Sequence, residues 1–552
     1  MGKLPGGGVG GALLPLPPRT GENAVRRPLD VLQDTILAVR ERLSALTGQS
    51  ERTIMLGSVL LVSSVSAATG FVLTQYYSID VLSSLVFVPD DCTFDWTINF
   101  GRHCFSDAVL TMDFGRRPNP WEPYPVPALS SHLPHLNGYV PAAVRSNYPA
   151  AGMVPHMTFW LLGQWLHAPR LGLFGYLLAL TIAVMSPALW AARGARGLER
   201  VVVVVACGIA AIPAWMAVDR GNSAGFVVPI ALVFLVALCR RRWGLVAIMV
   251  VLAAMVKPQF AVLGIALFVA RQWRWGGVAV AGVVMSNAAA YLLWPRDFPD
   301  TIMQSIRHTI SYGGVFQAAT TLNVSFGKGL LMIPDGIKAS QNGGKVPDGY
   351  LAGPRSLIGY AILLLVVVSL LALGRRIAPV MAGIVLLAAA ALFPVVSLPY
   401  YLVFALPVAA LVARDPHGPP GTGIFERLAS VGERRRAVGI CVSLAAALSI
   451  AHMALPSPSM PAEIAGPVQA GVSAIVQTRA LVVTTATLTP LLWLVACGAI
   501  IISYARRPAL ASRNDHGQAP EASPNTAVSA SRTSEELTEL ASGARPPATG
   551  KR

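Results

Sequence analysis

Long apolar stretches that alternate with short arginine-rich segments constrain this chain more than any other feature of its sequence. An α-helix needs about 20 apolar residues to cross a hydrocarbon core that is roughly 30 Å thick. Only 13% of the 552 residues are charged, whereas an ordinary soluble domain carries about 25%. This composition argues against a soluble protein, a coiled coil and a disordered chain. The sequence therefore predicts an all-α polytopic membrane protein.

The apolar stretches predict a bundle of about 10–12 transmembrane helices. Lys257-Pro258 interrupts one stretch, 245–270, and leaves two halves that are each too short to span alone. We expect these halves to form a hairpin or a broken helix pair that returns to the side it left. Full spans are expected at 54–73, 171–192, 201–218, 224–239, 276–294, 357–373, 377–393, 401–413, 437–455 and 480–503.

Basic residues predict the orientation, because short cytoplasmic loops of membrane proteins are rich in Lys and Arg. The net charge of +16 is therefore interpreted through this rule, and no nucleic-acid partner is predicted. Both termini are expected to be cytoplasmic in a multi-pass protein of the plasma membrane. Two long loops, 74–156 and 295–355, then lie outside. The clusters that fix this orientation are Arg193/Arg196/Arg200, Arg240–Arg242, Arg271/Arg274, Arg375/Arg376, 414–436 and Arg506/Arg507.

The two ends of the chain differ in character from the membrane domain, which is expected at 54–503. Residues 1–27 are rich in Gly and Pro, and residues 508–552 are rich in Ala, Ser, Thr and Pro, so both segments are expected to be disordered and cytoplasmic. Apolar residues at helical spacing in 28–48 predict an amphipathic helix on the membrane surface. A short solvent-exposed helix is the alternative there.

Charged residues at membrane depth are rare and usually functional. Lys257 is the sharpest example, because it stands before a proline in the middle of an apolar stretch. It is either a snorkelling lysine at a helix end or a cation that binds an anionic group such as a lipid phosphate. Asp219-Arg220 is either an ion pair that caps a span or a substrate contact, and Gly221-Asn222 favours a turn.

The first long loop carries several acids and many aromatic residues, as a folded loop would. Cys92 and Cys104 are the only cysteines on the expected outer side, and a disulfide between them is a hypothesis. The histidines of this loop fit no standard zinc spacing. The chain contains no Walker A or HExxH sequence, and neither a metal nor a cofactor is predicted.

Several short motifs follow one another in a characteristic order between residues 54 and 413. They are Asn119-Pro120-Trp121, Asn147-Tyr148-Pro149, Arg220-Gly221-Asn222, Arg240-Arg241-Arg242-Trp243, Leu252-Ala253-Ala254-Met255-Val256-Lys257-Pro258, Leu322-Asn323-Val324-Ser325 and the run FPVVSLPYY at 393–401. This order resembles glycosyltransferase family 87 of the GT-C superfamily, whose actinobacterial members include polyprenyl-phosphate-mannose-dependent mannosyltransferases and a similar arabinofuranosyltransferase.

The resemblance implies transfer of a sugar from a polyprenyl-phosphate donor to a lipid or cell-envelope glycan acceptor at the outer face. Mannose is the sugar that we expect. An acid of the first outer loop, Asp95 or Asp107, would be the general base. Lys257, with Arg220, would neutralise the departing phosphate. The remaining candidates for substrate binding are Asn222, Asn323, Ser325, His308 and Tyr400.

Three other functions remain open at this point. An arabinofuranosyltransferase would use the same chemistry with another donor sugar. A transporter or flippase of a lipid-linked envelope precursor would also use a broken helix pair, although no repeat relates the two halves of the chain. A non-catalytic scaffold would tolerate replacement of Asp95, Asp107 and Lys257.

Overall fold

A computed structural model describes residues 49–77, 105–125, 143–311, 322–342, 346–347, 349–463 and 476–509. The chain divides into two units, Met1–Ser50 and Glu51–Arg552, and the helices and strands of the described residues all belong to the second unit. The expected amphipathic helix at 28–48 and the segment 1–27 lie outside the described residues, as do residues 510–552 of the expected tail.

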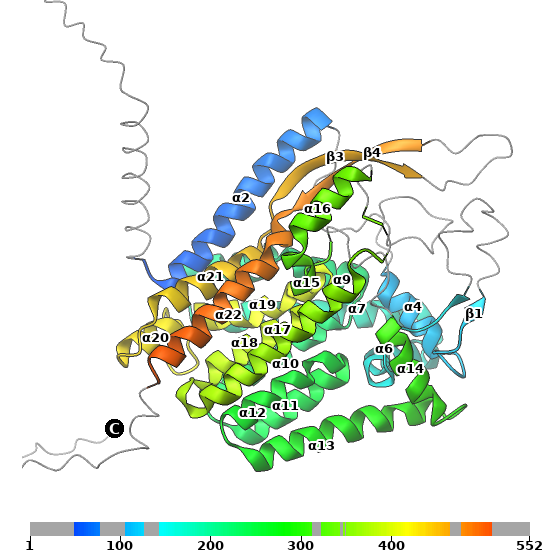
Figure 1. Ribbon diagram of the computed structural model, residues 1–552, viewed down its shortest axis with the longest axis horizontal. Helices are drawn as coiled ribbons and strands as arrows, with labels where there is room; N and C mark the ends of the chain where they lie inside the picture. Colours follow the sequence, from blue (N-terminus) through cyan, green and yellow to red (C-terminus); the bar gives the residue numbers. More distant parts are fainter. Residues whose placement is uncertain are drawn as a thin grey trace, which may run out of the picture. The chain divides into compact units, whose positions relative to one another are not determined.

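The second unit consists mainly of helices, shown in Figure 1. The α-helices of the first half are α2 (Glu51–Tyr77), α4 (Ser106–Gly115), α6 (Ala150–Trp165), α7 (Pro169–Ala192), α8 (Gly197–Val204), α9 (Ile212–Arg220), α10 (Ala224–Cys239), α11 (Trp243–Val256), α12 (Ile265–Val269) and α13 (Trp273–Ala290). Those of the second half are α14 (Asp300–Ser311), α15 (Phe326–Leu330), α16 (Met332–Gln341), α17 (Ala352–Leu373), α18 (Pro379–Leu392), α19 (Ala405–Ala413), α20 (Ile424–Ser430), α21 (Arg436–Ile450) and α22 (Thr489–Arg506).

Short 3₁₀ and π segments extend or join these helices. They are η2 (Val205–Ile209), η3 (Pro258–Gly264), η4 (Tyr291–Leu293), η7 (Gly374–Arg376), η8 (Pro399–Phe404) and η9 (Thr485–Leu488). Two antiparallel strand pairs complete the fold, β1 (Tyr124–Pro125) with β2 (Ala143–Val144), and β3 (Ala454–Glu463) with β4 (Val476–Thr484). The expectation of an all-α protein therefore holds except for these two pairs.

Five helices of the described chain are long and apolar enough to cross a membrane. A sixth crossing is possible at Gly197–Ile209 with Ile212–Arg220, a pair bent by 45°. The chain is thus a multi-pass membrane protein. The other four expected full spans correspond to helices of 10–17 residues, which are shorter than a full crossing requires.

Two expectations of helix shape are corrected. The stretch 201–218 is not one straight helix, because a π segment and Pro213 interrupt its hydrogen bonds and produce the bend. The span expected at 480–503 begins later, since residues 480–484 belong to β4 and α22 starts at Thr489. The sequence Val482-Val483-Thr484 is β-branched throughout, which favours a strand.

The break expected at Lys257-Pro258 is confirmed as the end of α11 and the start of η3. Proline cannot donate the next helical hydrogen bond and disfavours helical geometry in the residue before it. Lys257 accordingly has extended backbone angles, with φ −145° and ψ 111°. The break therefore turns this one side chain out of the helical register.

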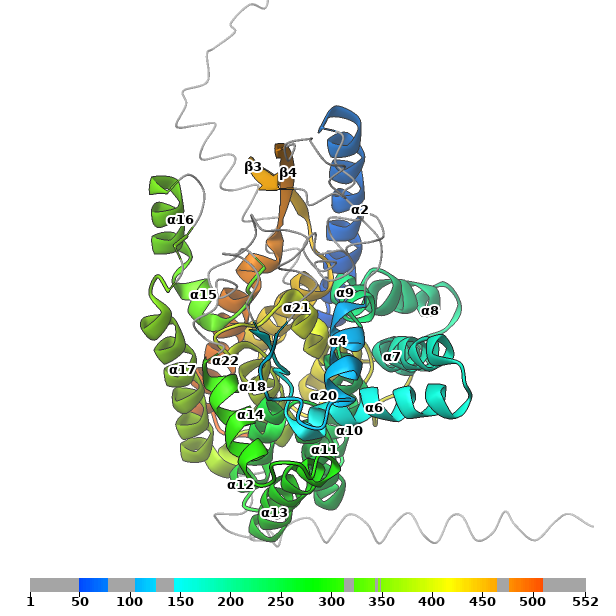
Figure 2. The same ribbon diagram turned by 90° about the vertical axis from the view of Figure 1, so that its right-hand side faces the viewer.

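Helix α18 forms the centre of the bundle. It packs against α10, α17 and α22, and all of its residues from Val380 to Leu392 are buried. On one side of α18, helix α10 packs against α11, and α11 packs against α13, in the lower part of Figure 1. Helices α4, α6 and α14 gather at the right-hand end of the bundle in Figure 1, which is the end that faces the viewer in Figure 2.

The outer helices expose large apolar side chains. Phe71 on α2, Met285 on α13 and Leu357 on α17 are between 67% and 70% exposed. Apolar surface of this extent on several helices marks contact with membrane lipid. The bundle therefore buries both small and large apolar residues in its centre and presents further large apolar residues to the bilayer.

The packing of α18 against α10 provides a test of this arrangement. A β-carbon on Gly383 would clash with Leu238 Cδ1, whereas Gly277 on α13 has no neighbour within 4 Å. Gly383→Leu should lower the thermal unfolding temperature of the purified protein, because overpacking costs about 1–3 kcal/mol. Gly277→Leu is the matched control and should not. Equal Tm values for the two variants would contradict the central position of α18.

Candidate functional site

Asp107 lies in the first turn of α4 and contacts residues of the α9–α10 turn. The Nδ2 of Asn222 donates to Asp107 Oδ2 at 2.5 Å, and Arg220 Nε lies 3.6 Å from the same oxygen. Asn222 Nδ2 also donates to the hydroxyl of Tyr148 at 3.1 Å. We call Asp107, Tyr148, Arg220, Asn222 and Lys257 the Asp107 cluster.

The turn between α9 and α10 depends on its glycine. Gly221 has φ +65°, in the left-handed region, and a β-carbon there would lie 2.6 Å from Ala108 Cβ. Helix α4 therefore approaches the turn closely enough for Asp107 to reach Asn222. The Oδ1 of Asn222 accepts from the backbone N–H of Ala224 at 2.9 Å and so holds the start of α10.

Lys257 joins the cluster from the break between α11 and η3. Its Nζ lies 3.8 Å from the ring centroid of Tyr148 and 5.8 Å from that of Tyr401, and the residue is 8% exposed. A snorkelling lysine would place its ammonium in water, whereas this one ends over aromatic faces. Among the described residues, no carboxylate lies within 4 Å of it.

Two motifs between α4 and α6 form one folded unit beside the cluster. Trp121 Nε1 donates to Tyr148 O at 2.9 Å, and Ser146 N donates to Pro120 O at 2.9 Å. Asn119 Oδ1 accepts from Trp121 N at 3.0 Å. The contacts fix Tyr148, whose ring faces Lys257 and whose hydroxyl contacts Asn222.

Tyr400 and Tyr401 reach the same region from η8. The guanidinium of Arg220 lies 5.5 Å from the ring centroid of Tyr400, and the two tyrosine rings are 4.9 Å apart. Segments far apart in the sequence therefore contribute to one site at α4, before α6, between α9 and α10, after α11 and in η8.

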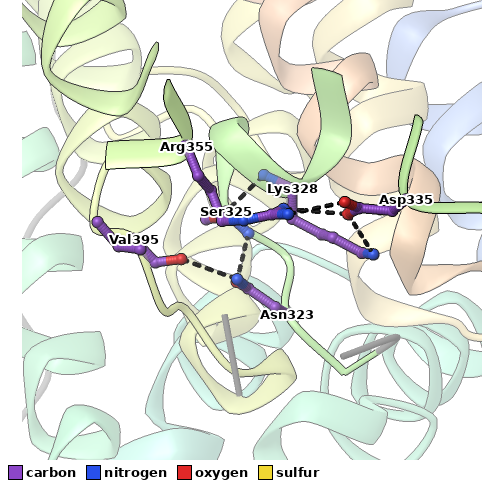
Figure 3. A network of polar contacts seen from close by, with 6 residues as sticks. All are labelled: Asn323, Ser325, Lys328, Asp335, Arg355 and Val395. Atoms are coloured by element: carbon purple, nitrogen blue, oxygen red, sulfur yellow. Dashed lines mark hydrogen bonds and ion pairs between the residues drawn. The ribbon is translucent and has the colours of Figure 1, made fainter. Parts of the chain in front are cut away.

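Asn323 holds the turn that leads into η8 (Figure 3). Its Nδ2 donates to Val395 O at 2.8 Å, and its Oδ1 accepts from the backbone N–H groups of Ser397 and Ser325, both at 3.0 Å. Ser325 Oγ accepts from Lys328 N and caps α15. Both side chains are fully buried, and in this structure their hydrogen bonds go to backbone. A direct contact of either with substrate stays a prediction.

A buried charge network anchors this region to α17. Arg355 donates to both oxygens of Asp335 at 2.7 and 3.0 Å, and Lys328 Nζ lies 2.7 Å from Asp335 Oδ2 (Figure 3). Burial raises the pKa of Asp335, but the hydrogen bonds from Arg355 and Lys328 outweigh it and leave that pKa below its usual value. The network therefore keeps its carboxylate ionised and ties α15, α16 and α17 together.

His156 and Tyr176 lie directly beside the cluster, although nothing in the sequence pattern singled them out. His156 Nε2 and Gly221 O are each 2.9 Å from the hydroxyl of Tyr176, and both side chains are buried. The imidazole also contacts the ring of Tyr148 edge to face. Aromatic residues in apolar helices usually belong to the hydrophobic core. Their spacing in the sequence does not distinguish a core residue from a residue of a functional site.

The remaining predicted site residues fall into two groups. Asp95, Cys92 and Cys104 lie outside the described residues. His308 lies on α14; burial, and then the charge of Arg145, lower its pKa from the usual value. Within the described parts of the chain, no three His, Cys, Asp or Glu side chains are grouped to hold a metal.

The hydrogen bonds between the Asn323 side chain and the turn before η8 lead to a testable prediction. Asn323→Ala leaves the buried N–H groups of Ser397 and Ser325 without their acceptor, which costs about 1–3 kcal/mol for a buried group. Amide hydrogen exchange at residues 395–401 should therefore accelerate by roughly tenfold or more. Asn287→Ala, which removes a bond only within α13, is the control. An unchanged exchange rate in Asn323→Ala would show that the turn is stable without the hydrogen bonds of this side chain.

Comparison of the chain with protein families, with curated proteins and with solved structures finds no match. The resemblance to glycosyltransferase family 87 therefore stays an expectation. What the site does has to follow from its own chemistry, namely one carboxylate and two cations brought together among tyrosine rings at the breaks of several helices.

Proposed function

We propose that this chain is an integral membrane glycosyltransferase with a GT-C-type bundle. It moves a sugar, mannose in the first instance, from a polyprenyl-phosphate donor to a lipid or glycan acceptor at the outer face of the plasma membrane. The buried ammonium of Lys257 carries the proposal, because it lies over two aromatic rings and makes no ion pair within 4 Å with a carboxylate of the described residues. A charge buried in this way favours an anionic ligand.

A lipid phosphate fits this environment better than a soluble anion. The site lies at helix breaks inside an apolar bundle, and the exposed side chains of the outer helices contact lipid. A polyprenyl tail is accommodated in the bilayer while its phosphate reaches Lys257 and Arg220. The aromatic faces of Tyr148 and Tyr400 then leave both cations partly desolvated, which strengthens their attraction for phosphate.

Asp107 supplies the complementary group for the reaction. Its carboxylate accepts the proton of the acceptor hydroxyl as the hydroxyl oxygen attacks the anomeric carbon. The bond from that carbon to the phosphate oxygen breaks, and the electron pair leaves with polyprenyl phosphate. Lys257 and Arg220 stabilise the charge that develops on the leaving phosphate. Asn222 orients Asp107 through its hydrogen bond.

Transfer assays test these roles directly. Membranes containing each variant are supplied with a radiolabelled polyprenyl-phosphate sugar, mannosyl or arabinosyl, and a glycan acceptor. Asp107→Asn should lower the rate by about 10²–10⁴-fold as a lost general base. Lys257→Ala should lower it by about 10²–10³-fold as lost charge stabilisation.

Asp113→Asn is the matched control, because Asp113 lies on the same helix and pairs with Arg117 at the surface. It should retain full activity. Asp95→Asn belongs in the same series: loss of activity in Asp95→Asn alone would assign the base to that residue and remove it from Asp107. No transfer by the wild type from either donor, with lipid-linked precursor still crossing the membrane, would support a transporter instead.

The proposed orientation has an independent test at the two ends of α13. Asp300 lies in the expected outer loop and Arg274 in an expected cytoplasmic segment, and both are exposed. In intact cells, an impermeant maleimide should label Asp300→Cys, and it should label Arg274→Cys only after permeabilisation. The unsubstituted chain provides the background from native cysteines. The reverse pattern would place the site on the cytoplasmic face.

A further inference from the structure

A polar cavity of about 300 Å³ lies outside the Asp107 cluster, between described parts of the two long loops. Trp121 and Pro123 form apolar parts of its wall. Its volume is at the lower end of the range for small-molecule sites. The polar residues that line it are Asn119, Glu122, Arg145, Asp297, Gln304 and Arg307.

The lining carries equal numbers of acids and bases. Arg296, beside the cavity, lies 3.5 Å from both Glu122 and Asp297 and so neutralises much of the acidic charge. Arg145 and Arg307 are exposed and make no ion pair with described residues. Their guanidinium groups therefore offer several hydrogen-bond donors to a ligand.

Amide groups complete the lining and hold its two sides together. Asn119 Nδ2 donates to Asp297 Oδ2 and to Gln304 Oε1, both at 3.0 Å. The wall thus combines fixed amides, partly neutralised carboxylates and available guanidinium donors. Such a mixture of donors and acceptors, with balanced charge, suits a neutral ligand that carries many hydroxyl groups.

The cavity is connected to the Asp107 cluster through one hydrogen-bonded pair. Trp121 lines the cavity and donates to Tyr148 O, and Tyr148 contacts both Lys257 and Asn222. The pair separates the two regions, since both side chains are buried. A ligand that reaches both regions must therefore extend past this pair.

We propose that this cavity binds a sugar unit of the acceptor, distant from the hydroxyl that attacks the donor. The acceptor is then an oligosaccharide, and the cavity selects its length. This inference rests on the proposed function, because it assigns the acceptor of the same reaction.

The test uses the purified full-length protein and acceptors of one to four units, made of mannose or arabinofuranose. The wild type should show a KM that falls as the acceptor becomes longer. Arg145→Ala and Arg307→Ala should raise KM for the longest acceptor by roughly tenfold or more, as expected for a lost hydrogen bond to a charged group. Their kcat, and their KM for the single-unit acceptor, should not change.

Arg116→Ala is the control, because Arg116 is an exposed arginine of the same loop that contacts Trp160. Equal KM values for Arg307→Ala and wild type at every acceptor length, or an equal rise at every length, would overturn the proposal. Tighter binding of inorganic phosphate than of the oligosaccharide, lost in Arg307→Ala, would identify an anion site and overturn it as well.

Equilibrium binding without donor separates this inference from the proposed function. Saturable binding of the four-unit acceptor to wild type, weakened in Arg307→Ala, supports the cavity even where no sugar is transferred. The opposite outcome is that the wild type transfers sugar at a rate that depends neither on acceptor length nor on Arg145 and Arg307. That result would support the glycosyltransferase and contradict the acceptor site.

Discussion

Every backbone N–H and C=O that leaves a helix within a bilayer must find a partner inside the protein. This constraint explains how the site is built. Asn222 supplies the acceptor for Ala224 N after the Gly221 turn, and Asn323 supplies partners for Ser397 N and Val395 O before η8. The side chains that bond to the backbone groups at these helix breaks also position Asp107 and the two tyrosines of η8.

The same breaks account for the unusual environment of Lys257. Desolvation of an ammonium costs several kcal/mol, and contact with aromatic faces returns about 2 kcal/mol when the cation is desolvated. The rings of Tyr148 and Tyr401 therefore hold the charge without fully compensating it. By contrast, Lys328 and Arg355 are buried against Asp335 and form a complete network. In the proposed function Lys257 binds a ligand with its charge, whereas the charge of Lys328 is used within the structure.

The sequence predicted the features that depend on local composition. Apolar stretches located most of the helices, and Pro258 located the end of α11. Two features were not predictable in this way. The bend between α8 and α9 requires a π segment that hydropathy does not distinguish from α-helix, and the pairing of β3 with β4 joins two segments that are not adjacent in the sequence.

The site was predictable residue by residue but not as an assembly. Arg220, Asn222 and Lys257 were selected as polar groups at membrane depth, and Asp107 was selected, as an alternative to Asp95, among the acids of the expected first outer loop. Their contacts could not be foreseen, because Asp107 and Asn222 are 115 residues apart and meet only through tertiary packing. The selection of Asn323 for substrate binding stays a prediction, and the sequence did not indicate that its side chain would also bond to the backbone of Val395 and Ser397.

The burial of α18 on all sides has a consequence for biogenesis. Its neighbours include α10, which is made earlier, and α22, which is made later. Until α22 enters the membrane, lipid has to cover the face of α18 that this helix later occupies, in keeping with insertion before association. Segment η8 follows α18 and packs against α21, which is also synthesised later. A nascent chain that has already inserted Asp107 and Lys257 therefore lacks the packing partners of η8 and α18 until α21 and α22 have been made, and the Asp107 cluster is supported as in this structure only after that point.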